Sequence, residues 1–250
     1  MKGMGVFVAL VLAAGTPGRA GQAELPAFDV ASVRANRSDS PNANCGRVTG
    51  NQYAATNCSV VSLLRLAFDI QEFQIAGQPA WADRDRFDIV ATIPDGARPP
   101  DNWRLMVQAL LRDRFKLRFH REQRPASVFA LTVGKGGHRL TPAGPCERPN
   151  GRCDFNGSPA RVWGESVSMA QFAARLSRSL GVMVVDRTGL SSLYDVSLEW
   201  TVEDQFRGRG ASASPTIFTA IQDQLGLRLE STTGTVDMLV VDSVESPPDN

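Results

Sequence analysis

Apolar residues follow two regular patterns along this chain. In 60–67 and 169–176 they recur every three or four positions, the spacing of one helix face, at Val60, Leu63, Leu64 and Ala67 and at Met169, Phe172, Ala173 and Leu176. In 87–93 and 194–200 they alternate with polar residues, as in strands with one buried face. The two patterns predict a chain of helices and half-buried strands.

The same order of patterns occurs twice. Residues 53–75 align with 162–184 without a gap, and further matches follow in order: 86–93 with 193–200, 110–119 with 220–229, and 127–133 near 236–242. Such self-similarity indicates duplicated structural units. We therefore predict an α+β protein of two tandem β-α-β-β-α-β-β repeats. Each repeat is expected to have a mixed or antiparallel sheet covered on one face by two helices.

Composition places the boundaries of these repeats. The first repeat is expected over 24–134, with an extra N-terminal strand in 28–36 that has no counterpart in the second repeat, expected over 161–245. A Gly/Pro-rich, cysteine-bearing linker covers 135–160, and we expect the tail 246–250 to be disordered.

Capping residues mark the expected helix ends. Asp101 and the pair Ser214 and Pro215 precede helical patterns, where a side-chain cap and a proline are both favourable. Gly181 and Gly226 follow the last apolar positions, where a residue in the left-handed conformation ends many helices. We expect two helices to begin at the first set and two to end at the glycines.

Residues 1–23 are interpreted as a targeting segment. Lys2 precedes a run of nine apolar residues, 6–14, whereas a membrane-spanning helix needs about 20. We expect a cleaved secretory signal, cut after Ala23 or, alternatively, after Ala20. The protein is then exported to the periplasm or the extracellular space, with no transmembrane segment after cleavage.

Charge and cysteine content narrow the classes of partner and cofactor. The 27 basic and 26 acidic residues give a net charge of +1, which argues against nucleic acid as a partner. In an exported chain four cysteines favour disulfides, and we expect Cys45–Cys58 and Cys146–Cys153. A zinc site is the alternative, but the short spacing of zinc thiolates is absent, so we expect no metal and no cofactor.

The stretch Asp186-Arg187-Thr188-Gly189 suggests a catalytic aspartate. The matching stretch of the first repeat, 76–86, has no Asp-Thr-Gly, and an aspartic protease needs a pair of carboxylates in matching loops. We therefore expect a turn between two strands, with Asp186 and Thr188 bonded to nearby backbone.

A basic cluster around 112–124 contains the candidate binding residues. They are Arg114, Arg118, His120, Arg121 and, from an earlier segment, Trp81. The cluster runs from a helix end into a strand, so its members need not share one face, and a solvated surface is the simpler interpretation. The alternative is a site for an anionic partner such as a cell-wall polymer. No residue is predicted to be catalytic, because no nucleophile is identifiable beside His120.

The segments 74–94, 110–144 and 184–201 resemble one known family. It comprises exported proteins, greatly expanded in soil acidobacteria, that are catalogued only as a domain of unknown function. Its members often end in Val-Ile-Asp-His-Val-Glu, where this chain has Ser243 in place of the histidine. Some relatives are fused to membrane peptidases of the β-lactam-sensor type, which implies a sensing module outside the cell. The resemblance implies no catalytic residues.

Residues 165–201 are also similar to short N-terminal modules of secretins and TonB-dependent receptors, at the level of fold alone.

These observations favour an exported binding or protein-interaction module over an enzyme. The expected partner is an envelope protein or a cell-wall component. One alternative is a hydrolase of an envelope polymer that uses His120 with Asp88 or Glu122. The other is a structural envelope protein.

Overall fold

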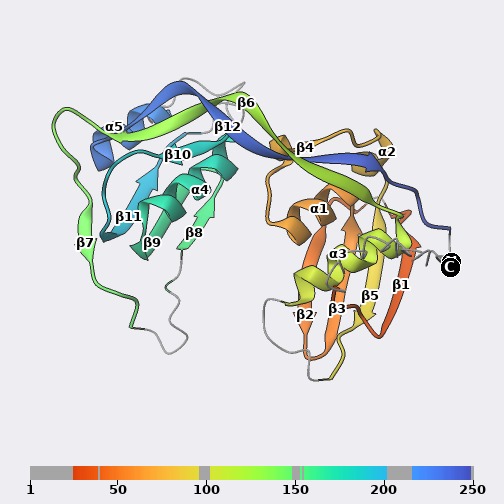
Figure 1. Cartoon of the computed structure of the whole chain (residues 1–250). Helices are drawn as coiled ribbons and strands as arrows, with labels where there is room; N and C mark the ends of the chain where they lie inside the picture. Colours follow the sequence, from red (N-terminus) through yellow and green to blue (C-terminus); the bar gives the residue numbers. More distant parts are fainter. Residues whose placement is uncertain are drawn as a thin grey trace, which may run out of the picture.

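The computed structural model describes residues 25–38, 40–95, 102–147, 153, 155–201 and 216–248. These residues form two lobes joined by a long two-stranded ribbon (Figure 1). They contain twelve strands in three sheets and five α-helices, which confirms the α+β class. The expected signal segment 1–23 and the expected helix start at Asp101 lie outside the described residues.

The first lobe is built on an antiparallel sheet in the order β1-β5-β3-β2. Its strands are β1 (Val30–Ala35), β2 (Asn44–Thr49), β3 (Gln52–Cys58) and β5 (Phe87–Thr92). Alternation along β5 buries Phe87, Ile89 and Ala91 in a core shared with the helices α1 (Val60–Phe68) and α3 (Asn102–Arg114). The short helices η1 (Glu72–Gln74) and α2 (Trp81–Arg84) complete this lobe.

The second lobe has an antiparallel sheet in the order β7-β11-β9-β8. Its elements are β7 (Thr141–Ala143), β8 (Phe155–Ser158), β9 (Arg161–Val167), β11 (Leu193–Glu199), α4 (Met169–Leu180) and α5 (Ile217–Leu225). We predicted that the strand in 28–36 has no counterpart in the second repeat. This is wrong, because a strand of the second lobe occupies the equivalent edge position in its sheet. β7 pairs with β11 at the edge where β1 pairs with β5. At three residues with a central Pro142, β7 is too short to show an alternating pattern.

The third sheet connects the lobes, in the order β10-β6-β12-β4. The strands β6 (Arg118–Val133) and β12 (Leu227–Ser243) pair antiparallel along their length, with β10 (Val184–Asp186) and β4 (Ile75–Ala76) as short parallel neighbours. We expected separate strands in each repeat, with 127–133 and 236–242 as strands of their own. This expectation is wrong. Pro125 faces only β12 as a neighbouring strand among the described residues, so one side of β6 is free there and can accept a proline.

Each lobe has its own core, and the ribbon contributes to both. Leu239 and Val241 of β12 lie in the first core, whereas Leu131 of β6 and Leu227 of β12 lie in the second. The strand β12 therefore returns from the second lobe to complete the lobe that contains β1.

Two of the expected helix ends are confirmed and one start is corrected. Gly181 and Gly226 end α4 and α5 with φ of 66° and 65°, in the left-handed region predicted for them. Helix α5 begins at Ile217 rather than at Ser214, because the Thr216 hydroxyl caps it by accepting a hydrogen bond from the backbone N–H of Thr219. Ser214 itself lies outside the described residues.

Both predicted disulfides are present. Cys45–Cys58 joins β2 to β3 beside the first core, and Cys146–Cys153 closes a loop before β8. Within the described ranges, no helix is long and apolar enough to cross a membrane.

Candidate functional site

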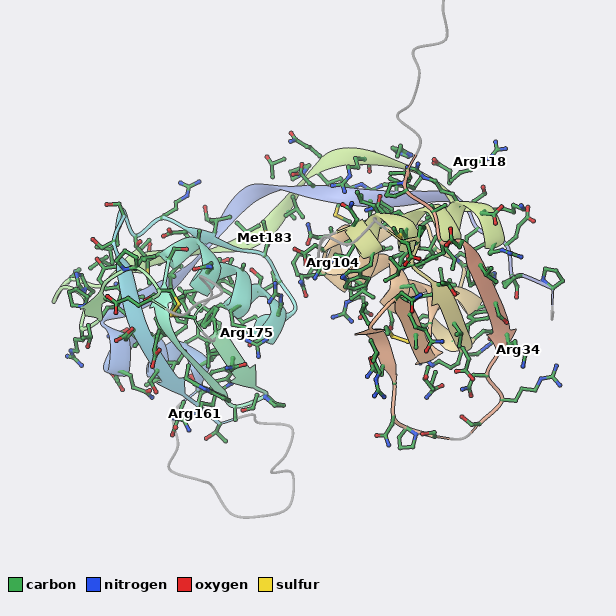
Figure 2. The ribbon with its side chains drawn as sticks, turned by 90° about the horizontal axis from the view of Figure 1, so that it is seen from below. Arg34, Arg104, Arg118, Arg161, Arg175 and Met183 are labelled. Carbon is green, nitrogen blue, oxygen red and sulfur yellow. A yellow bond between two sulfur atoms is a disulfide. The ribbon has the colours of Figure 1, made fainter. Side chains whose placement is uncertain are left out.

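The binding residues predicted from the sequence do not converge on one site. Arg118 and His120 lie on the exposed side of β6, and Figure 2 shows Arg118 at the end of the ribbon in the first lobe. Arg121 lies on the opposite side of the same strand, with its guanidinium 5.9 Å from the ring centroid of Phe68. Side chains alternate between the two sides of a strand, so Arg121 points away from Arg118 and His120 and the three do not surround one ligand.

The other two candidates lie elsewhere in the first lobe. Arg114 ends α3, where its Nε is 3.1 Å from a carboxylate oxygen of Asp113 and its Nη2 donates to the backbone oxygen of Ala31 at 3.3 Å. Trp81 begins α2 and packs against the first core. Arg114 already has local partners, and Trp81 contributes to the packing of the lobe.

The residues of the alternative hydrolase are partly brought together. His120 Nδ1 lies 2.8 Å from an oxygen of Asp242, and its Nε2 lies 3.8 Å from Glu122. Asp88 is engaged in a different place, where it accepts hydrogen bonds from the Asn36 side chain and from the backbone N–H of Asn57. His120 therefore has an orienting acid in Asp242, a residue that the sequence did not indicate.

The Asp186 stretch is a turn, as expected. Asp186 accepts hydrogen bonds from the backbone N–H of Thr188 at 2.9 Å and from its hydroxyl at 2.8 Å. Gly189 follows with φ of 71°. Asp186 thus directs the chain from β10 towards β11.

A pocket of about 670 Å³ lies in the second lobe, where no candidate residue was predicted. Its lining comes from β8, from α4, from the two residues that follow β11 and from the start of α5. Its polar lining includes two arginines of α4, Arg175 and Arg178, with the hydroxyls of Ser158 and Ser179. Figure 2 shows Arg175 in the second lobe, well away from Arg118.

The position of Arg175 follows from the packing of α4. The side chain of Ser168 accepts a hydrogen bond from the backbone N–H of Gln171, which fixes the start of the helix. Phe172 and Leu176 bury the core-facing side. Arg175 then reaches the edge strand β8, where a Cβ at Gly157 would overlap its guanidinium. The absence of a side chain at Gly157 is therefore what lets the guanidinium lie against the strand.

Arg175 is a partly buried cation without a counter-charge among the described residues. Its Nε is buried and has no hydrogen-bond partner there, and none of the described ion pairs includes this residue. Burial lowers the pKa of the Arg175 guanidinium, and the nearby Arg178 cation lowers it further. Arginine remains protonated at neutral pH, so the Arg175 guanidinium is still a cation in the empty pocket.

The first lobe fills the corresponding region with apolar side chains. In the ungapped alignment of 53–75 with 162–184, Leu66 of α1 stands at the position of Arg175. A Cβ at Gly46 of the edge strand β2 would lie 3.2 Å from Leu66 and 3.4 Å from Trp103 at the start of α3. The Trp103 ring stacks on Tyr53 with centroids 5.7 Å apart. In the sequence, the only sign of the pocket is that Arg175 stands where the first repeat has the apolar Leu66.

The fold and the pocket thus define a two-lobed α+β protein with a cationic pocket in one lobe. A family model described as "Protein of unknown function (DUF3738)" matches residues 61–244, which span both lobes. The chain belongs to this family, and the resemblance to a domain of unknown function is confirmed. No curated protein and no solved structure matches the chain.

Proposed function

We propose that this protein is an exported, non-enzymatic binding module that holds an anionic group of its ligand on Arg175. The observation that carries this proposal is the partly buried guanidinium at the wall of a 670 Å³ pocket, with no counter-charge among the described residues. A desolvated charge is costly unless it is paired. A ligand that brings the opposite charge into the pocket removes this cost, which favours the bound state.

The lining of the pocket supports binding over catalysis. Its described polar side chains are arginines and hydroxyls, whereas general acid–base chemistry at neutral pH uses groups such as histidine or a carboxylate. Arginine holds its proton throughout the physiological range. The pocket is therefore equipped to orient an anion rather than to transfer a proton.

Two disulfides support the export of this protein, because disulfides persist in oxidising compartments. We propose a periplasmic or extracellular location and an envelope protein or cell-wall component as the source of the ligand. The matching strand orders of the two lobes support an origin by tandem duplication. In this proposal the first copy kept the apolar Leu66 at this position, and the second copy acquired Arg175.

The test is calorimetric titration of the disulfide-bonded protein with acetate and with inorganic phosphate. Arg175→Leu, which installs the residue of the first lobe, is expected to weaken binding at least tenfold, since hydrogen bonds to charged groups contribute about 1.5–3 kcal/mol. Arg34→Leu is the matched control, because it removes the same charge from an exposed position on β1 in the other lobe. Equal affinities in wild type and Arg175→Leu would refute the proposal.

The paired His120 and Asp242 support one second candidate, a hydrolase of an envelope polymer. A histidine oriented by a carboxylate is one part of a general base. A screen against envelope polymers would have to find an activity that His120→Ala abolishes and Arg175→Leu spares. A screen that finds none removes this candidate and leaves the binding proposal intact.

A further inference from the structure

The arginine pocket has an apolar wall as well as a cationic one. Phe218, the second residue of α5, lines it and is 43% exposed, although large apolar side chains are usually covered. Ile217 and Trp200 line it too, and both are nearly buried. The lining of the pocket therefore includes both an open aromatic surface and a guanidinium.

The Phe218 ring is held in place from behind. It packs edge-to-face against Phe129 of β6, with centroids 5.3 Å apart and an interplanar angle of 69°. A ring fixed in this way loses little conformational entropy when a ligand covers it. Covering apolar surface contributes about 25 cal/mol per Å², so the ring offers affinity that a bare ion cannot use.

The size of the pocket also exceeds the needs of a bare ion. Its volume of about 670 Å³ lies within the range of about 300–1,000 Å³ that is typical of sites for small organic ligands. Because Nε of Arg175 is covered, an acceptor reaches this guanidinium at its terminal nitrogens, whose paired N–H groups match two oxygens of one oxyanion. The Ser158 and Ser179 hydroxyls lie on the same lining and supply further donors.

We infer that the ligand is an amphiphilic oxyanion, an inference that rests on the proposed function. It carries a carboxylate or phosphate that binds Arg175, joined to an apolar group of about the size of a benzyl group that packs on Phe218. The two sources of this chemistry are acyl or peptidyl carboxylates and organic phosphates, and the test separates them.

The experiment compares two matched pairs of probes on the disulfide-bonded protein by calorimetry: acetate with 3-phenylpropionate, and inorganic phosphate with phenyl phosphate. We expect the aromatic member of at least one pair to bind at least tenfold more tightly than its bare ion. The pair that shows the larger gain identifies the head group. Phe218→Ser is expected to remove most of this gain, and Arg175→Leu to weaken both members of each pair.

Val90→Ser is the matched control, since Val90 is 50% exposed on β5 in the other lobe and does not line the pocket. It should leave all four affinities as in wild type. If the bare ions bind as tightly as the aromatic probes and Arg175→Leu weakens them, the amphiphilic ligand is refuted and the anion site stands. If Arg175→Leu changes none of the four affinities, both proposals fail.

Discussion

Arg175 shows how a single side chain gives one lobe a property that the other lacks. Its counterpart Leu66 packs beside Gly46 and Trp103 in the first lobe, whereas the guanidinium of Arg175 lies against Gly157 beside an open pocket. The backbone arrangement around both positions is similar, with an edge strand, a core helix and the start of a second helix. The difference between a filled and an open region therefore lies in the side chains.

Gly157→Ala tests this arrangement without changing any charge. The added methyl group would occupy the space of the Arg175 guanidinium and displace it. We expect acetate or phosphate binding to weaken at least fivefold, with little change in the free energy of unfolding, since β8 is an edge strand. Calorimetry and urea unfolding measure the two effects. Gly136→Ala, where a methyl group meets no atom within 4 Å, is the control and should change neither.

The Ser177 side chain connects α4 to β10, and its removal is a second test at the residue scale. Its buried hydroxyl donates to the backbone oxygen of Ala173 and accepts from the backbone N–H of Val184 at 2.8 Å. Ser177→Ala leaves that N–H buried and unpaired, so we expect the free energy of unfolding to fall by about 1–3 kcal/mol. Urea unfolding checks this, with exposed Ser179→Ala as the control. A change below that of Ser179→Ala would contradict the contact.

At the scale of elements, the helices and paired cysteines were the most predictable features. The helical spacing from Val60 and from Met169 and the glycines at 181 and 226 each depend on local sequence, which is why they agree with α1, α4 and α5. The long strands β6 and β12 were not predicted as continuous. Their continuity depends on pairing with each other over a distance of about a hundred residues, and Pro125 and Gly234 interrupt the local pattern.

The two disulfides should differ in their effect on stability. Cys45–Cys58 spans 13 positions and its Cys58 is fully buried, whereas Cys146–Cys153 spans 7 positions. Loop-closure entropy gives about 3 kcal/mol for the first and about 2 kcal/mol for the second. We expect the double variant Cys45→Ala with Cys58→Ala to lose more unfolding free energy than Cys146→Ala with Cys153→Ala. Chemical denaturation would contradict this if the order were reversed.

At the scale of the whole molecule, the lobes are interlocked by the last strand. Leu239 and Val241 of β12 complete the first core, although they follow the second lobe in the chain. A linear division into two repeats does not reveal this exchange, because apolar alternation shows that a strand has a buried face but not which core it enters. Likewise, the sequence candidates Arg118 and Arg121 are close in sequence but separated by the alternation of β6.

Removal of residues 236–250 tests the interlocking. The first lobe would lose Leu239 and Val241, and deletion of a buried leucine side chain alone costs about 2–5 kcal/mol. We expect the amide signals of the first lobe to lose their dispersion in two-dimensional NMR, while most second-lobe signals remain. Removal of 246–250 alone is the control and should leave both lobes folded. A folded first lobe in the longer deletion would contradict the shared core.

The central claim is that Arg175 binds an anionic group of the ligand. The most direct measurement is the NMR signal of the Arg175 Nε–H group, assigned by its loss in Arg175→Leu, during titration with 3-phenylpropionate and with phenyl phosphate. We predict that this signal shifts and saturates with at least one probe, while the Arg34 signal stays in place. An Arg175 signal that does not move with either probe, at concentrations where Arg34 is also unchanged, would contradict the claim.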